Sequence, residues 1–177
     1  MKSKKLQANP KRSDEDKAKM KSFVKSEPIK TVDGFIKASD IIRQKLIDCG
    51  GKAIYHNSRK EHEFFYDGSK DAFCSPTGLG NGKFELAIFD VVVDLMIEQG
   101  GKGLKGNARS GDKLGFGANR IDTIDGVIAY RHDGTKIGTA SFGYFSAVLP
   151  IMEWAEIVVI HRGYAELSNK YLSMIKA

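Results

Sequence analysis

The apolar and polar positions divide the chain into short helices and β-hairpins. Apolar residues recur at helical spacing between Ser39 and Gly50, which predicts a helix capped at its start and ended by paired glycines. Its buried side is expected to hold Ile41, Ile42, Leu46 and Ile47. Residues 52–68 then alternate as two strands around a polar turn, which predicts a β-hairpin.

The most apolar stretch is residues 83–99, where only a narrow acidic stripe interrupts the apolar surface. Because this stretch contains no turn signal, it predicts a helix at the centre of the core. Residues 121–134 predict a shorter helix closed by Gly134, and residues 169–177 predict a final helix that docks on the body.

The segment of residues 141–168 combines a helix with a hairpin. Its apolar residues first follow a helical rhythm, and a β-branched run then predicts a strand at residues 157–160. A polar turn with Arg-Gly at its tip follows at residues 161–163, and residues 164–167 alternate as a returning strand. The segment therefore predicts the order helix, strand, basic turn, strand.

This segment resembles the second helix and the wing of a winged helix-turn-helix domain. The resemblance covers residues 141–168 and, with the preceding helices, about half of the chain. It implies that residues 83–99 form the first helix of the winged unit and that the protein binds nucleic acid. Pro150 lies inside the expected recognition helix, so that helix either begins late, near Ser146, or is kinked.

Together these elements predict an α+β fold, mainly helical with small β-hairpins. We expect three parts: a basic disordered tail of residues 1–30, a helix-plus-hairpin subdomain of residues 31–75, and a winged-helix-like domain of residues 76–177. The tail is predicted to be disordered because its few apolar residues cannot offset the loss of chain entropy.

The net charge of +6 belongs to the tail. Ten of the 28 Lys and Arg residues and four of the 22 Asp and Glu residues lie in residues 1–30, which leaves 18 of each sign in the rest of the chain. The expected folded body is therefore neutral. A basic tail suits a polyanionic partner, although solubility alone also explains it.

A Gly/Lys loop, residues 100–120, is the exception within this neutral body. It has seven glycines, five basic residues and one acidic residue, Asp112. Glycine lets backbone N–H groups approach phosphate closely, and Lys and Arg release counterions when they bind it. The loop is thus the main candidate for a structured polyanion contact, and a solvated connector is the alternative.

The candidate nucleic-acid-binding residues come from the Gly/Lys loop, the start of the expected recognition helix and the tip of the wing. They are Lys102, Lys105, Arg109, Lys113, Arg120, Lys136, Ser141, Tyr144, Ser146, His161 and Arg162. The residues at the helix start include none of the Arg, Asn or Gln that make the commonest base contacts, which favours contact dominated by the phosphate backbone.

Other chemistries find little support in the sequence. The two cysteines lie far apart without a CxxC pair, and Lys83 is followed by Phe84 where a P-loop requires Ser or Thr. We expect no cofactor, no metal site and no catalytic residue. No stretch is apolar enough to span a membrane, and the basic start lacks the apolar segment of a secretory signal, so a cytoplasmic location is expected.

The sequence thus predicts a non-enzymatic DNA-binding protein, associated with the nucleoid, with DNA favoured over RNA. A protein-interaction or assembly module on the same fold, with a protein partner or a homo-oligomer, is one alternative. The other is a small metal-dependent nuclease built on His56 and His62 with the neighbouring Glu61 and Glu63.

Overall fold

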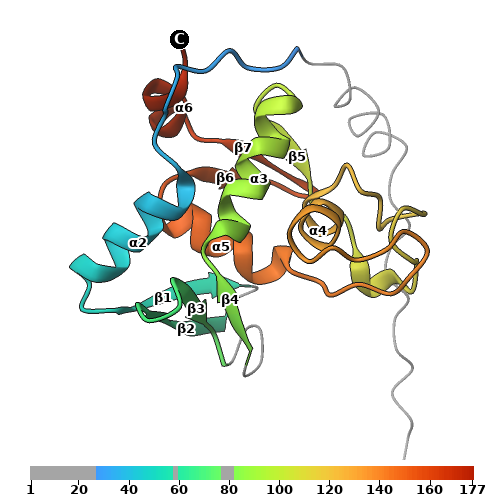
Figure 1. Ribbon diagram of the computed structural model, residues 1–177, viewed down its shortest axis with the longest axis horizontal. Coiled ribbons are helices and arrows are strands. Elements are labelled where there is room, and N and C mark those ends of the chain that lie inside the picture. Colours follow the sequence, from blue (N-terminus) through green and yellow to red (C-terminus); the bar gives the residue numbers. More distant parts are fainter. Residues whose placement is uncertain (1–26, 58–59, 77–81) are drawn as a thin grey trace, which may run out of the picture.

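The computed structural model describes residues 27–57, 60–76 and 82–177, which form an α+β fold with two antiparallel sheets (Figure 1). Residues 1–26 of the expected disordered tail lie outside the described residues. The N–H of Ile29 donates to the carbonyl of Ile97 at 3.0 Å. The chain therefore joins the folded body before residue 31.

The first sheet has four strands in the order β1-β2-β3-β4. They are β1 (Lys52–Asn57), β2 (Lys60–Asp67), β3 (Ala72–Cys74) and β4 (Lys83–Glu85). β1 and β2 confirm the predicted hairpin at residues 52–68. β4 occupies residues predicted to begin the apolar helix, and that prediction is wrong because these residues pair with β3 instead.

The helices α2 (Ala38–Asp48) and α3 (Ala87–Glu98) pack against each other. The prediction that Ile47 is buried is wrong: its side chain is 51% exposed, whereas Ile42 and Leu46 are fully buried. Ser39 does not cap α2 either. Its backbone N–H and its hydroxyl donate to the Asp90 carboxylate at 2.9 and 2.7 Å, and these bonds tie α2 to α3.

The second sheet has three strands in the order β5-β7-β6. The elements of this half, in chain order, are α3, β5 (Lys102–Leu104), α4 (Ile124–Val127), a π-helical turn (Ile128–His132), α5 (Phe145–Trp154), β6 (Val158–Ile160), β7 (Tyr164–Leu167) and α6 (Asn169–Ile175). β6 and β7 confirm the predicted hairpin, and all strand pairs are antiparallel. β5 lies inside the Gly/Lys loop, where the sequence predicted no strand.

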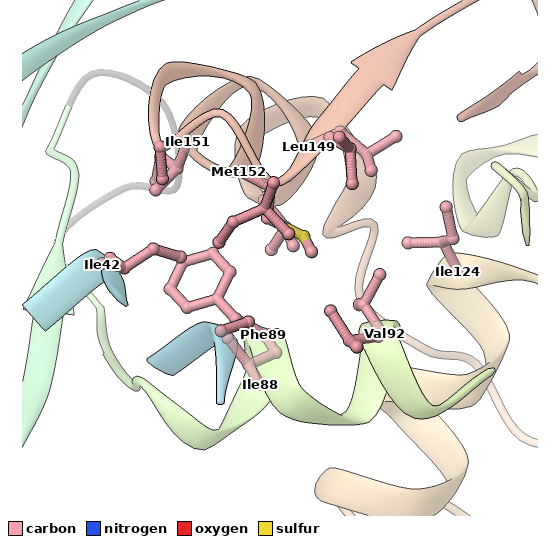
Figure 2. Close-up of a cluster of buried hydrophobic side chains, with 14 of the residues drawn as sticks. Ile42, Ile88, Phe89, Val92, Ile124, Leu149, Ile151 and Met152 are labelled. Carbon is pink, nitrogen blue, oxygen red and sulfur yellow. The ribbon is translucent and has the colours of Figure 1, made fainter. Parts of the chain in front are cut away.

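One hydrophobic core joins the two halves of the chain. Figure 2 shows Ile42 of α2 and Phe89 of α3 beside Ile151 and Met152 of α5, and these side chains are fully buried. The core also extends to α4 through Ile124. The expected boundary between residues 75 and 76 falls between β3 and β4 of a single sheet, so the two expected units share both a sheet and a core.

Helix α5 lies inside the molecule and contains Pro150. The six residues 147–152 are all buried, because α5 packs against β1, β6 and α2. A proline cannot donate to the carbonyl four residues earlier, which is that of Ser146. The side chain of Asn57 in β1 donates to this carbonyl at 2.5 Å. A residue of the first sheet thus satisfies the acceptor that the proline leaves open.

Candidate functional site

The Gly/Lys loop and the β6–β7 turn (residues 161–163) border one cavity of about 510 Å³. Its lining comprises Leu104, Lys105, Gly106, Asn107, Gly117, Ala118, Arg120, Thr123, Phe145 and Gly163. A second cavity of about 350 Å³ runs along α5 to the end of β1, where His56 and Asn57 line it. Lys105 and Phe145 line both cavities, so the two cavities are adjacent, and we call them together the α5 cleft.

Lys105 holds the middle of this cleft. Its Nζ donates to the carbonyl of His161 at 2.6 Å, and its backbone N–H donates to the carbonyl of Gly163 at 3.1 Å. Burial lowers the pKa of the Lys105 ammonium, and the nearby Glu153 carboxylate opposes this shift. An ammonium has three donors, so one hydrogen bond to a carbonyl leaves capacity for an anion in the cleft.

Asp125 links the two segments that form this end of the cleft, the start of α5 and the Gly/Lys loop. Its Oδ1 accepts from the N–H groups of Tyr144 and Phe145 at 2.7 and 2.8 Å, and its Oδ2 accepts from that of Ala108 at 3.1 Å. The side chain is almost completely buried. Burial raises the pKa of the Asp125 carboxyl, whereas the three backbone donors oppose this shift. One buried carboxylate therefore fixes the start of α5 against the Gly/Lys loop.

Internal packing explains two of the glycines that line the cleft. Gly106 and Gly117 have φ values of 75° and 52°, a region that disfavours side chains. A Cβ atom at Gly106 would collide with the Thr123 hydroxyl, and one at Gly117 would collide with the Asp112 carboxylate. At these two positions glycine is therefore required by the close approach of neighbouring segments.

The basic candidates differ in their exposure and in their partners. Five are exposed, namely Arg109, Lys113, Arg120, Lys136 and Arg162. Arg120 forms an ion pair with Asp122, two residues away. Lys102 is half-buried with its ammonium 3.9 Å from the Glu166 carboxylate. The His161 ring also bonds Glu166, at 2.9 Å, and it stacks on Tyr164. Acidic neighbours thus balance part of the charge that the loop and the turn present.

The three candidates at the start of α5 are held within the fold. Tyr144 is buried and its hydroxyl donates to Asp133 at 2.5 Å. The Ser141 hydroxyl accepts from the Asn119 amide at 2.8 Å, and Ser146 contacts Asn57 through its carbonyl. A buried tyrosine at this position does not suit contact with a base edge.

The hairpin histidines do not meet in one site. The His62 ring stacks on Tyr55 at 5.2 Å, and Glu63 forms an ion pair with Lys52 at 2.5 Å. His56 lines the far end of the α5 cleft instead. Within residues 27–57, 60–76 and 82–177, no group of three or more His, Cys, Asp or Glu side chains is placed to hold a metal ion.

Sequence reasoning missed Asp125 and Phe145 as parts of this site. The signal for Asp125 was a carboxylate in the otherwise apolar run of residues 124–128, inside the helix predicted at residues 121–134. Phe145 packs against the core, but it is half-buried and also lines both cavities.

Comparison of the chain with protein-family models, curated proteins and solved structures gives no match. Among the helices of the described residues, none has the length and apolar character that crossing a membrane requires.

Proposed function

We propose that this protein binds nucleic acid, DNA foremost, through the α5 cleft and without catalysis. The observation that carries the proposal is that the Gly/Lys loop and the β6–β7 turn border one cavity. Lys105 and Arg120 line it, and Arg162 precedes Gly163 in its wall. A cleft edged by cations from distant segments suits a phosphate backbone, because Lys and Arg there can bind several phosphates at once.

The element order supports a winged-helix-like unit in residues 87–167. Helix, strand, two helices and two strands follow one another, and β7 lies between β5 and β6. The β6–β7 turn then corresponds to the wing and α5 to the recognition helix of the resemblance. The segments that join β5 to α4 and α4 to α5 are long, and in Figure 1 they lie together beside α4, at the right of the view.

The buried position of α5 indicates the mode of contact. A recognition helix reads base edges with side chains that project from it into the major groove. Here residues 147–152 are buried in the core, and the Asn57 side chain bonds the Ser146 carbonyl. We therefore propose that the loop and the wing make the contact and that phosphates dominate it.

A salt series with matched variants tests this proposal. The first variant combines Arg109→Ala, Lys113→Ala and Arg162→Ala, three exposed cations of the loop and the wing. Binding of the full chain to a mixed-sequence duplex should weaken, and the slope of log K against log salt should fall by about 0.9 for each phosphate contact that is lost.

The control combines Lys37→Ala, Lys70→Ala and Lys176→Ala, which removes the same charge from exposed positions elsewhere. It should retain most of the affinity and the slope. Equal losses in the two variants would mean that only net charge matters, and this would overturn the proposal. Salt-insensitive self-association without duplex binding would instead support the assembly module.

A further inference from the structure

The Gly/Lys loop carries an exposed apolar tip that the cleft does not use. Phe116 is 58% exposed, and Ile137, in the segment before α5, is 51% exposed. The segments that carry them are neighbours, because a Cβ atom placed on Gly115, the residue before Phe116, would lie 2.8 Å from Ile137 Cγ2. Exposed apolar side chains that gather at one place mark a contact surface more often than scattered ones do.

The backbone holds this tip rigidly. The N–H of Leu114 donates to the carbonyl of Thr139 at 2.9 Å, and the N–H of Gly138 donates back to the carbonyl of Leu114 at 2.8 Å. Within the loop, Gly115 and Asn119 are joined by a further bond of 2.8 Å. These cross-links bind the segments around Phe116 and Ile137 to each other.

Buried side chains anchor the same two segments. Leu114 and Asn119 are completely buried, and the Asn119 amide donates to the Ser141 hydroxyl at 2.8 Å. The Asp112 carboxylate accepts from the N–H of Ala118 at 2.8 Å, which closes the loop below Phe116. The apolar tip is thus presented to solvent by a fixed support.

Cations flank the tip on both segments. Lys113 lies three residues before Phe116, and Lys136 directly precedes Ile137; both are exposed. An apolar tip with an exposed lysine on each of its two segments complements nucleic acid, whose bases offer flat apolar faces beside a line of phosphates. Proteins that distort DNA insert Phe or Ile between base steps in this way.

We infer that Phe116 and Ile137 form a wedge that inserts between the bases of the nucleic acid bound at the α5 cleft, while Lys113 and Lys136 hold the adjacent phosphates. This inference rests on the proposed function. The wedge unstacks the bases that it separates, and it favours sites where stacking is already weak, such as a mismatch.

The test uses the full chain and a duplex that carries a fluorescent adenine analogue, whose emission rises when it is unstacked. Wild-type protein should raise the emission, most of all beside a mismatch. Phe116→Ala should abolish the rise and weaken binding to the mismatched duplex by about 5- to 100-fold, because base–aromatic stacking contributes on that scale. Its salt slope should stay unchanged, because no cation is removed.

Two further variants sharpen the test. Phe116→Trp should keep the emission rise, and Tyr130→Ala, which removes an aromatic ring that is 45% exposed on the π-helical turn, should behave as wild type. If wild type binds with a clear salt slope but does not raise the emission, the wedge is refuted and the proposed function stands. If wild type shows no salt-dependent binding, the proposed function itself fails.

The competing occupant is an anionic membrane surface. Flotation with vesicles of phosphatidylserine and phosphatidylcholine distinguishes the two. Vesicle binding that Phe116→Ala abolishes, together with unaffected duplex binding, would overturn the wedge. Duplex unstacking without vesicle binding is the result that we expect.

Discussion

Replacement of Asp125 by alanine should loosen the α5 cleft and destabilise the fold. The substitution removes the carboxylate that accepts from Tyr144, Phe145 and Ala108. It leaves three backbone N–H groups without that acceptor and opens a small cavity beneath the Gly/Lys loop. Two of these donors belong to the start of α5, where no helical carbonyl is in reach.

The expected loss follows from the environment of each donor. A buried donor left without a partner costs about 1–3 kcal/mol. Tyr144 is buried and should contribute most, whereas Phe145 and Ala108 are half-buried and can recruit water. Burial of the carboxylate destabilises the wild-type fold, and the substitution removes this cost, so part of the loss is offset. We therefore expect the free energy of unfolding to fall by roughly 2–4 kcal/mol.

Urea denaturation of the full chain measures this change. The midpoint should fall by about 1–2 M with little change in slope, since typical slopes are about 1–3 kcal/mol per molar. The control is Asp122→Ala, which removes a carboxylate that pairs with the exposed Arg120 side chain and should cost less than about 1 kcal/mol. Equal midpoints for the two variants would refute the role assigned to Asp125.

Two further predictions concern the same region. In urea denaturation, Gly126→Ala should lower the free energy of unfolding by about 3 kcal/mol or more, because the new Cβ collides with the Arg120 carbonyl. Gly134→Ala, at φ 66° with open space around it, should lower it by only about 1–2 kcal/mol. Equal losses would contradict the close approach at Gly126. Burial raises the folded-state pKa of Asp125 above 3.8, so the stability that this group contributes is lost as the pH rises from about 4 through the folded-state pKa. The unfolding free energy of wild type should therefore fall relative to that of Asp125→Ala over this window, and parallel curves would contradict the shift.

The sequence predicted the elements that depend on contacts between residues close together in the chain. The alternation of residues 52–68 and the β-branched run at residues 157–160 predicted both hairpins, because adjacent strands need only a short turn between them. Gly163, at φ 87°, ends the second turn as its residue type indicates. The final helix was also predicted, with Tyr171 and Ile175 buried.

Long-range pairing explains the errors. β3, β4 and β5 have three residues each, which is too few for a recognisable alternation. They are strands because they pair with neighbouring strands in their sheets. The hydroxyl of Ser39 bonds Asp90, 51 residues away, so its capping role could not be judged from its neighbours. Ile47 was assigned to the buried face, but α2 buries Ala38, Ile42 and Leu46 at a spacing of four.

The candidate site was predictable in its charge but not in its geometry. The basic residues of the Gly/Lys loop stand out in the sequence, and so does Arg162. The hydrogen bonds of Lys105 to His161 and Gly163 bring the loop and the β6–β7 turn together, and sequence spacing does not indicate these bonds. The ion pair of Arg120 with Asp122 could have been predicted from the sequence, because Asp122 lies two residues after Arg120, just beyond the Gly/Lys loop.

Nucleic-acid binding at the α5 cleft can be tested by titrating the isotope-labelled full chain with a short mixed-sequence duplex and following its backbone amide resonances. The proposed function predicts that the largest shifts fall on Gly106, Gly117 and Gly163, which line the cleft between the Gly/Lys loop and the β6–β7 turn. Strands β1–β4 should be affected little, apart from Asn57 at the cleft's far end. Shifts confined to residues 1–26, or centred on the outer face of the four-stranded sheet, would contradict it.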